Sequence, residues 1–376
     1  MSNDKNLNVH NPWDLAQMQS LPLEAKILLT KKRIEAWYES WTRYEIKNRK
    51  TGAIRFVAWD NRDIFSEPPL RKNEYIQAAY PGAVYVSFSG GKDSTVLKHI
   101  VDSMYDDVPS LFVNTGLEYP EIQKFAMSQK NVVTVRPEMR FDEVLKTYGY
   151  PAISKEVAKQ LYEVRKSAEF HGVMQRETAP YNRKFNPESD YCKKYPSYCF
   201  QKWDELIDAD FNISHMCCDV MKKKPAGKYE KETGRKPIVG TLATESRLRK
   251  TQWIRNGCNA FEGKRPTSQP LSFWTEQDIL AYIKKYNLPY ASVYGEIIET
   301  DTGLKTTKCE RTGCVYCMFG CELEGNPNRF QRLKETHPRQ YNYCINGGEM
   351  VDGKWQPNKE GLGLSHILDY MGVDYK

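Results

Sequence analysis

The spacing of apolar residues at the start of the chain predicts a helical extension. Apolar and aromatic residues recur near helical spacing over 23–48, and Pro22 is suited to the start of such a helix. The polar segment at 50–52 would end it, and the apolar run at 54–59 predicts a short strand. Residues 1–80 are therefore expected to form an N-terminal helical extension that packs on the rest of the chain.

From Gly82 onwards, short apolar runs alternate with amphipathic segments. The runs at 83–88, 110–114 and 132–135 predict strands, and the segments starting at 95, 121 and 141 predict helices. Such alternation indicates an α/β fold, in which a parallel sheet carries helices on both faces. Ligands of such sheets bind at the carboxyl ends of the strands. We expect this main domain to span residues 81–300.

A loop rich in glycine separates the first predicted strand of this domain from its helix. A loop of this kind exposes backbone N–H groups beside a helix N-terminus, where the helix dipole adds positive potential, so it suits a phosphate. The alternative is a plain glycine turn. The spacing of a Walker A loop is absent, which excludes that class of phosphate loop. The loop consists of Ser89, Gly90, Gly91, Lys92, Asp93 and Ser94.

Two further segments place polar residues after predicted strands. Asn114 and Gly116 follow the second strand. A later strand, starting near Pro237, leads into a turn with two arginines, whose planar guanidinium groups suit phosphate or sulfate. The candidate residues of that turn are Gly240, Glu245, Ser246, Arg247 and Arg249.

Composition is that of an ordinary globular protein, with 40% hydrophobic and 27% charged residues. No stretch approaches the roughly 20 apolar residues that span a bilayer, and the polar start lacks an apolar signal core. We therefore expect a cytoplasmic protein without a membrane partner. The net charge of +7 suits an anionic ligand but does not by itself demand nucleic acid.

Ten cysteines without a signal segment favour metal ligands or reactive thiols over a disulfide framework. Four of them lie close together in a cysteine-rich C-terminal segment, residues 301–376, and could form a local site: Cys309, Cys314, Cys317 and Cys321. Four thiolates suit an iron–sulfur cluster or a tetrahedral zinc ion, and spacing alone does not choose. Cys192, Cys199, Cys258 and Cys344 are isolated in the sequence and are interpreted as core or surface thiols.

The Ser-Gly-Gly-Lys-Asp-Ser loop resembles that of the PP-loop ATP pyrophosphatase superfamily. The resemblance is to the branch of phosphoadenosine phosphosulfate (PAPS) reductases, iron–sulfur adenylyl-sulfate reductases and DNA phosphorothioation sulfurtransferases. It implies a Rossmann-like fold of the adenine nucleotide α-hydrolase type. Members of the superfamily generally cleave ATP between the α and β phosphates and adenylate a substrate. The reductases, whose loop is usually degenerate, instead bind a ready-made adenylyl sulfate, so the complete loop favours ATP.

Other motifs extend the resemblance. The turn from Gly240 to Arg249 resembles the family pattern G-x-x-x-x-E/Q-S-x-x-R, and Lys155 lies in a segment that resembles one beside the nucleotide. At 114–116 the family usually has Asp-Thr-Gly, but Asn114 stands here, which puts an acid or metal role at that position in doubt. The segment from Cys217 to Pro225 resembles C-C-x-x-x-K-x-x-P.

The resemblance also implies a second set of cysteine ligands. Adenylyl-sulfate reductases bind a 4Fe–4S cluster with a Cys-Cys pair and a later C-x-x-C, and zinc remains the alternative here. The matching residues are Cys217, Cys218, Cys314 and Cys317. Family reductases end in a Glu-Cys-Gly tail, which the sequence to Lys376 lacks.

By resemblance we expect an ATP-binding enzyme that adenylates a substrate for sulfur transfer. The loop and Mg²⁺ would bind the phosphates, while Lys92, Asp93, Arg247 and Arg249 would act in catalysis. The sulfur donor and acceptor, a small molecule or a nucleic acid, are not identified. The alternatives are a thiol-dependent reductase that forms sulfite and, from another class, a non-catalytic nucleotide- and cluster-binding module that organises a partner.

Overall fold

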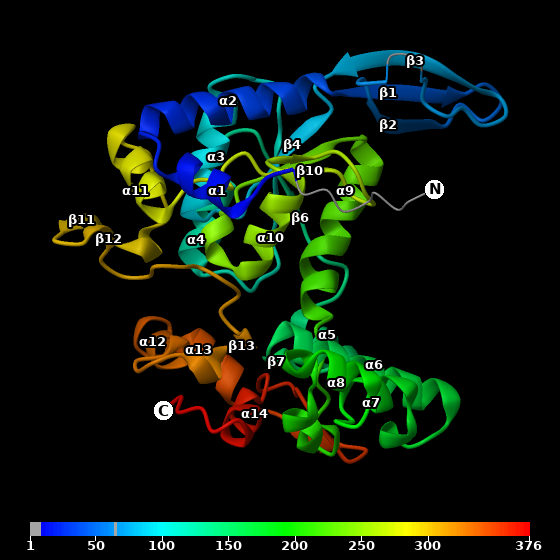
Figure 1. Cartoon of the computed structure of the whole chain (residues 1–376), viewed down its shortest axis with the longest axis vertical. Coiled ribbons are helices and arrows are strands. Elements are labelled where there is room, and N and C mark those ends of the chain that lie inside the picture. Colours follow the sequence, from blue (N-terminus) through cyan, green and yellow to red (C-terminus); the bar gives the residue numbers. More distant parts are fainter. Residues whose placement is uncertain (1–8, 64–65) are drawn as a thin grey trace. The chain divides into compact units, whose positions relative to one another are not determined.

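The structure, a computed structural model, describes residues 9–63 and 66–376 (Figure 1). The polar start of the chain, on which the localisation prediction rests, lies outside these residues. The chain divides into two compact units. Unit 1 contains the described residues up to Asn114, Tyr119–Val135 and Pro225–Thr312, and unit 2 contains Thr115–Glu118, Arg136–Lys224 and Gly313–Lys376.

A six-stranded sheet forms the centre of unit 1, in the order β6-β5-β4-β8-β10-β9. All neighbouring strands are parallel except β9, which pairs antiparallel with β10. The α/β prediction is therefore confirmed, with a mixed rather than fully parallel sheet. The strands are β4 (Val84–Ser87), β5 (Ser110–Val113), β6 (Val132–Val135), β8 (Lys236–Val239), β9 (Asn259–Ala260) and β10 (Thr267–Ser268).

The strand order reverses at β4, because the chain continues to β5 on one side while β8 pairs with β4 on the other. Such a switch point leaves space for a ligand outside the carboxyl ends of the strands. The helices of this region are α3 (Lys92–Asp102), α4 (Pro120–Ser128), α9 (Lys224–Thr233) and α10 (Arg247–Asn256). The predicted glycine-rich loop leads from β4 to α3, at this switch point.

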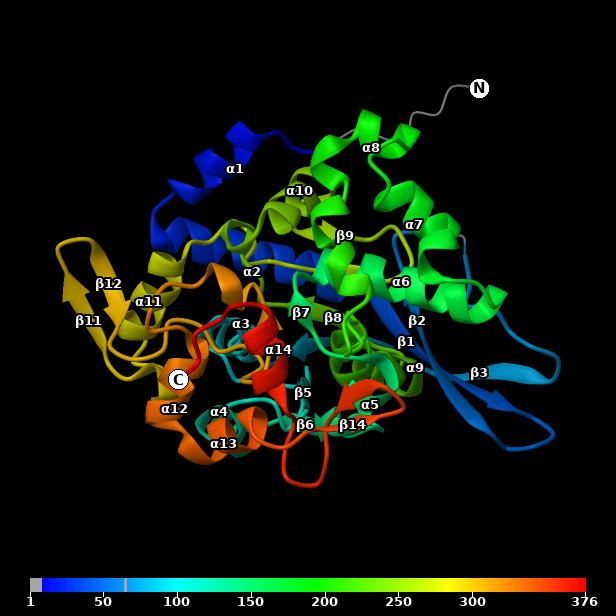
Figure 2. The ribbon, with the colours of Figure 1, turned by 90° about the horizontal axis from the view of Figure 1, so that it is seen from below.

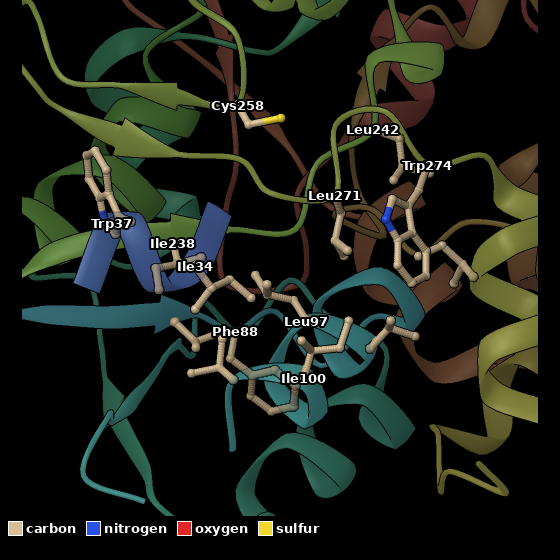
Figure 3. Packing of buried hydrophobic residues seen from close by; sticks show 14 of the residues in the cluster. Ile34, Trp37, Phe88, Leu97, Ile100, Ile238, Leu242, Cys258, Leu271 and Trp274 are labelled. Carbon is tan, nitrogen blue, oxygen red and sulfur yellow. The ribbon is translucent and has the colours of Figure 1, made fainter. Parts of the chain in front are cut away.

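Alternate residues of β4 pack on opposite faces of the sheet. Val84 and Val86 belong to the large core that includes Leu97 and Ile100 of α3 (Figure 3). Tyr85 instead packs with residues of β5 and α9. Because side chains alternate along a strand, this arrangement requires helices on both faces, as the sequence predicted.

The N-terminal region differs from the predicted helical extension. It begins with α1 (Pro12–Gln19) and α2 (Leu23–Glu39), but the helix predicted to reach residue 48 ends at Glu39. A three-stranded antiparallel sheet in the order β2-β1-β3 follows (Figure 2). Aromatic and β-branched residues favour strand over helix from Trp41 onwards. The strands are β1 (Trp41–Asn48), β2 (Ile54–Asp60) and β3 (Glu74–Pro81).

A buried ion pair joins α2 to α11 (Glu276–Lys285) within unit 1. Lys26, only 2% exposed, contacts Asp278 with its Nζ atom 2.6 Å from a carboxylate oxygen. The hydroxyl of Thr275 caps α11, accepting a hydrogen bond from the Asp278 amide. Unit 1 also contains a hairpin of β11 (Ile297–Thr300) and β12 (Gly303–Thr306).

Unit 2 is mainly helical, with two short sheets. β7 (Ala152–Ile153) pairs in parallel with β13 (Met318–Phe319), and β14 (Glu349–Val351) pairs antiparallel with β15 (Lys354–Gln356). The helices are α5 (Phe141–Tyr148), α6 (Lys155–His171), α7 (Ala179–Lys184), α8 (Asp190–Lys194), α12 (Arg329–Thr336), α13 (Pro338–Ile345) and α14 (Leu364–Tyr370). A single π-helical turn occupies Asp219–Lys223.

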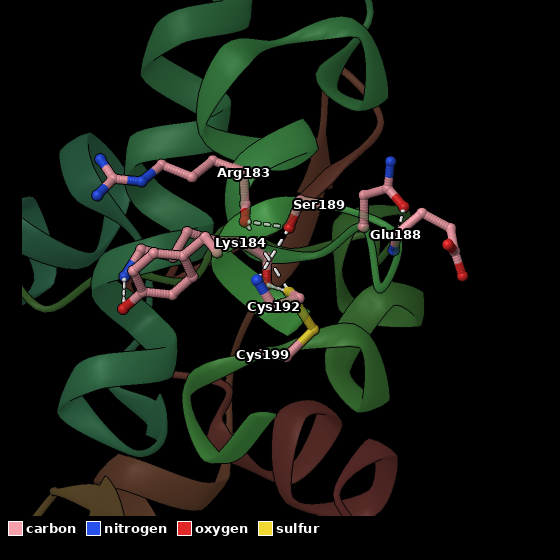
Figure 4. The surroundings of a disulfide bond; sticks show 8 residues. Arg183, Lys184, Glu188, Ser189, Cys192 and Cys199 are labelled. Atoms are coloured by element: carbon pink, nitrogen blue, oxygen red, sulfur yellow. Dashed lines mark hydrogen bonds between the residues drawn. A yellow bond between two sulfur atoms is a disulfide. The ribbon is translucent and has the colours of Figure 1, made fainter. Parts of the chain in front are cut away.

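The isolated cysteines divide into two kinds. Cys258 and Cys344 are buried free thiols, as predicted. Cys192 and Cys199 form a disulfide, so their interpretation as isolated thiols was wrong (Figure 4). Helix α8 and the turn after it bring their Cα atoms to 4.9 Å, within disulfide range. No helix of the described residues is both long and apolar enough to cross a membrane.

Candidate nucleotide site and thiol cluster

The glycine-rich loop of unit 1 is shaped so that only glycine fits at its centre. Gly90 has a φ of +75°, and a Cβ atom there would lie 3.0 Å from Cγ2 of Ile122 and 3.1 Å from Cβ of Ala126, both on α4. Gly91 is the N-cap of α3 and brings no capping side chain. The amides at the N-terminus of α3 therefore take their partners from outside the N-cap, among them the hydroxyl of Tyr294.

The two serines of the loop bond mainly to the loop itself. The Ser94 hydroxyl donates to the carbonyl of Gly91 at 2.9 Å and accepts from the amide of Ser89 at 3.2 Å. The two hydroxyl oxygens lie 3.0 Å apart. Sequence reasoning assigned both serines to the ligand, and in this structure they hold the loop in shape.

Lys92 is held by groups that the sequence did not identify. Its side chain is 6% exposed and forms an ion pair with Glu276, the first residue of α11. Its backbone N–H donates to the hydroxyl of Tyr294 at 3.3 Å, and that hydroxyl lies 2.6 Å from the Thr312 hydroxyl. An amide and an ammonium group suited to phosphate are thus each in contact with an oxygen of the protein.

Asp93 is half-buried among charged groups of unit 1. Burial raises its pKa to about 6, and Glu276 acts in the same direction. The positive charges of Lys92, Arg311 and Arg249 oppose this rise in pKa. The carboxyl is therefore largely ionised at neutral pH and surrounded by cations.

The turn after β8 contacts the start of α3. A Cβ atom on Gly240 would lie 3.1 Å from the carbonyl oxygen of Asp93, so the backbone approach requires glycine. The carboxylate of Glu245 accepts from the Leu242 amide at 3.0 Å and forms an ion pair with Arg249. Burial and the nearby Arg311 lower the pKa of Arg249, against the influence of Asp93.

The two predicted catalytic arginines have different surroundings. Ser246 caps α10 by accepting from the Arg249 amide at 3.3 Å, and Arg249 reaches Glu245. Arg247 is exposed and lies at a separate cavity of about 280 Å³. The cavity is lined by Leu15, Gln19, Ala243, Thr244, Ser246, Arg247 and Lys250.

The residues after β5 contribute packing and a turn. Asn114 is buried and accepts a hydrogen bond from the side chain of Gln123 on α4 at 2.7 Å. Gly116, in unit 2, has a φ of +74°. Beside it the Thr115 hydroxyl donates to Glu118 at 2.7 Å.

Four of the predicted metal ligands gather within unit 2. Cys217 hydrogen-bonds Cys218, which lowers the pKa of Cys218 below that of a free thiol, and the charges of Lys155 and Lys222 act in the same direction. The same hydrogen bond, together with burial, raises the pKa of Cys217, and so do the charges of Cys317 and Cys314. The two pairs, far apart in sequence, thus lie within electrostatic range of each other.

Two lysines accompany the thiols. Burial opposes the charge of Lys222, but Cys314 and Glu118 outweigh it and raise the pKa of Lys222. Burial raises the pKa of Cys314 to about 11, and Lys222 opposes the shift. Lys155, predicted beside the nucleotide, acts electrostatically on Cys218 within unit 2.

The alternative ligands have other surroundings. Cys309 belongs to unit 1, where its thiol donates to the Arg311 carbonyl at 2.9 Å. Cys321 is buried in unit 2, and burial raises its pKa to about 12. Over residues 9–63 and 66–376, no three His, Cys, Asp or Glu side chains are arranged as a ready metal site. The donor set at 217, 218, 314 and 317 nevertheless fits a thiolate-bound metal or cluster in its chemistry.

A comparison with known families decides the wider assignment. The family model described as the phosphoadenosine phosphosulfate reductase domain matches residues 83–319, more than half of the chain. The chain belongs to the PAPS reductase family. The match runs from β4, the strand before the glycine-rich loop, to β13, which follows Cys314 and Cys317. Membership supports a nucleotide-binding, sulfur-related function in a family whose members are generally enzymes.

A curated relative of this PAPS reductase family member is an uncharacterized protein of Methanocaldococcus jannaschii. The two are 25% identical over 267 residues, which is 70% of this chain and 47% of the relative. The chain thus spans about half the length of the relative that it matches.

Sequence reasoning missed four residues around the loop: Glu276, Tyr294, Arg311 and Thr312. Glu276 was visible as the first residue of a capped helix, but a sequence does not show which residue such a helix end contacts. Arg311 and Thr312 lie just before Cys314, in a segment interpreted only for its cysteines.

Proposed function

We propose that this PAPS reductase family member binds ATP, cleaves it between the α and β phosphates and adenylates an acceptor for sulfur transfer. The observation that carries the proposal is the complete phosphate loop at the switch point of the sheet, with Lys92 at the start of α3. The charges of Arg249 and Arg311 beside Asp93 support it, because a polyphosphate needs several cations.

In this proposal the phosphates exchange places with oxygens of the protein. The amides of Gly90 and Gly91 would donate to phosphate oxygens, and Lys92 would leave Glu276 for the phosphates. The Asp93 carboxylate would hold the Mg²⁺ that accompanies ATP, since carboxylate and phosphate oxygens are the ligands that Mg²⁺ prefers, and the ion would supply positive charge at the phosphates.

The reaction proposed is a displacement at the α phosphorus. An acceptor oxygen attacks the α phosphorus, the bond to the bridging oxygen of the β phosphate breaks, and pyrophosphate leaves with the electron pair. Arg249 would stabilise the negative charge that develops on the phosphates, as fixed cations do in such sites. A sulfur nucleophile such as sulfide then displaces AMP from the adenylated acceptor, and no oxidant or reductant is consumed.

We further propose that Cys217, Cys218, Cys314 and Cys317 bind a 4Fe–4S cluster, with zinc as the alternative. Their support is the donor set of four thiols in unit 2. Such a cluster, when bound, would carry electrons, pass sulfur or brace the fold. Lys222, whose pKa is raised by Cys314, would balance the charge of the thiolates.

Parallel incubations of the full chain, prepared without oxygen, test the proposal. One receives MgATP with sulfate, tRNA, DNA or small-molecule acceptors, and the other receives adenylyl sulfate or PAPS with a thiol. Pyrophosphate and AMP from ATP, without sulfite in the second incubation, is the expected result. Sulfite from adenylyl sulfate with no ATP cleavage would favour the reductase. A Lys92→Ala chain that loses ATP turnover yet keeps its cellular function would favour the non-catalytic module.

A further inference from the structure

We infer that Arg311 is a second anion-binding arginine, which binds the ATP phosphates together with Arg249. In the absence of ATP, Glu245 contacts both arginines, and the phosphates displace it when they bind. This inference rests on the proposed function and adds a residue that the motifs of the phosphate site do not include. The ligand class is a nucleoside polyphosphate or pyrophosphate.

Glu245 lies between the two arginines. Glu245 pairs with Arg249 through one carboxylate oxygen, and its other oxygen lies 3.8 Å from a guanidinium nitrogen of Arg311. Both arginines also act electrostatically on Asp93, the second residue of α3. Two guanidinium groups therefore converge on one carboxylate beside the phosphate loop.

The charged groups around the loop balance one another. The site contains three cations, Lys92, Arg249 and Arg311. They face three carboxylates: Asp93, Glu245 and Glu276. When all three cations and all three carboxylates are ionised, the net charge of the site is zero. A polyphosphate can therefore bind the cations only by displacing the carboxylates that contact them. Glu245 and Glu276 occupy the places that phosphate oxygens would take.

The exchange at Arg311 costs little. Its side chain is 59% exposed, and its contact with Glu245 is long, so solvent screens this ion pair and its loss affects stability little. A phosphate can instead accept two parallel hydrogen bonds from a guanidinium group, which is a stronger contact. The free-energy cost of moving Arg311 from Glu245 to a phosphate ligand is therefore small.

The backbone next to Arg311 is tied to the loop. The Thr312 hydroxyl lies 2.6 Å from that of Tyr294, which accepts from the Lys92 amide. A Cβ atom on Gly91 would lie 3.2 Å from the Tyr294 hydroxyl oxygen. The hydrogen bonds of Thr312 and Tyr294 thus hold the segment that carries Arg311 beside the glycine-rich loop. The guanidinium group of Arg311 is thereby kept near the amides proposed to bind phosphate.

Calorimetric titration of the full chain with pyrophosphate and with MgATP tests the inference. Arg311→Ala is expected to weaken both affinities by about ten- to hundredfold, the usual loss for a charged hydrogen bond. Arg311→Lys should fall between, because lysine cannot bind in a bidentate way. Arg332→Ala is the matched control, since Arg332 is similarly exposed and lies 3.7 Å from Glu324 in unit 2.

Glu245→Gln provides an independent measurement, because it removes the competing charge and keeps an oxygen for the Leu242 amide. It is expected to tighten pyrophosphate binding by about threefold or more. If wild type binds pyrophosphate and Arg311→Ala, with an unchanged thermal unfolding curve, binds it equally well, the inference is overturned and the proposed function stands. If wild type binds neither ligand, both fail.

Discussion

The phosphate loop of unit 1 and the thiol cluster of unit 2 are built in opposite ways. The loop is six consecutive residues that follow β4 and continue into the first turn of α3, and most of the groups proposed to bind phosphate are backbone amides. The thiols come from segments around 217 and 314, with Lys155 from a third, and each segment contributes side chains only. A site made of consecutive residues can be predicted from the sequence. A site assembled from side chains that are distant in the sequence is recognised only in the folded structure.

The two sites also balance charge differently. In unit 1, carboxylates neutralise the cations that a phosphate would bind, and the ion pairs at Lys92 and Arg249 stand in for the ligand. In unit 2, lysines stand beside thiols whose ionisation a metal would complete. In the proposed function, unit 1 would exchange an internal carboxylate for a bound anion, and unit 2 would receive a metal cation.

The largest expected effect separates the two possible cysteine sets. Cys217→Ser and Cys314→Ser should abolish iron content, because each removes a ligand of the proposed cluster. Cys309→Ser and Cys321→Ser should leave it intact, and these two variants serve as controls. Iron, sulfide and zinc are measured in chain prepared without oxygen. Loss of metal in the Cys309 and Cys321 variants, with retention in Cys217→Ser, would instead assign the local set, and zinc without iron would overturn the cluster.

The next effect concerns the anion site of unit 1. Lys92→Ala should lower the rate of pyrophosphate release by at least about a hundredfold, because a fixed cation at the transferring phosphate is lost. Lys98→Ala is the control, since Lys98 lies on the same helix but pairs with Asp102 at 2.7 Å. Metal content should be the same in both variants. Equal rates in Lys92→Ala and wild type would remove the loop from the reaction.

A third prediction tests whether the N-terminal helices stabilise unit 1. Lys26→Met leaves the Asp278 carboxylate buried without its cation and should lower the free energy of unfolding by about 3 kcal/mol. Lys285→Met removes an exposed, solvent-screened ion pair with Glu24 between the same two helices and should leave the free energy of unfolding nearly unchanged. Urea unfolding measures both variants. Similar losses in the two would show that α2 is not held by the buried pair.

An effect of at most similar size, which depends on pH, follows from the raised pKa of Asp93. Because that pKa is about 6 in the folded chain and 3.8 in the unfolded chain, ionising Asp93 costs stability above pH 6. Asp93→Asn should therefore stabilise the chain at pH 7.5, by up to about 3 kcal/mol. The gain should shrink as the pH falls through 6 and vanish below about 4. The exposed Asp301→Asn is the control, and a gain independent of pH would contradict this account.

Much of unit 1 could be predicted from the sequence, for physical reasons. The parallel strands are short apolar runs and the helices between them are amphipathic, so β6 and α5 appear at the predicted residues. The prediction failed at residue 40, where helical spacing continues but aromatic and β-branched residues form β1. The spacing of apolar residues reflects only neighbours along the chain. It does not show whether a partner strand is available to pair with the segment.

The rest of the candidate sites depended on contacts between distant segments. Nothing in the sequence near Arg311 shows that it reaches Glu245, and nothing near Lys155 shows that it acts on Cys218. The disulfide between Cys192 and Cys199 was missed for a related reason: the turn of α8 that brings them together is not an apolar pattern. Tertiary packing decides these contacts.

The central claim, cleavage of ATP between the α and β phosphates, is tested most directly with ATP labelled at the γ phosphate. The metal-loaded full chain is incubated with this ATP, Mg²⁺ and the candidate acceptors, and the labelled products are separated. We expect the label to leave as pyrophosphate in wild type and to stay in ATP with Lys92→Ala. Label released as orthophosphate, or equal pyrophosphate release from both chains, would contradict it.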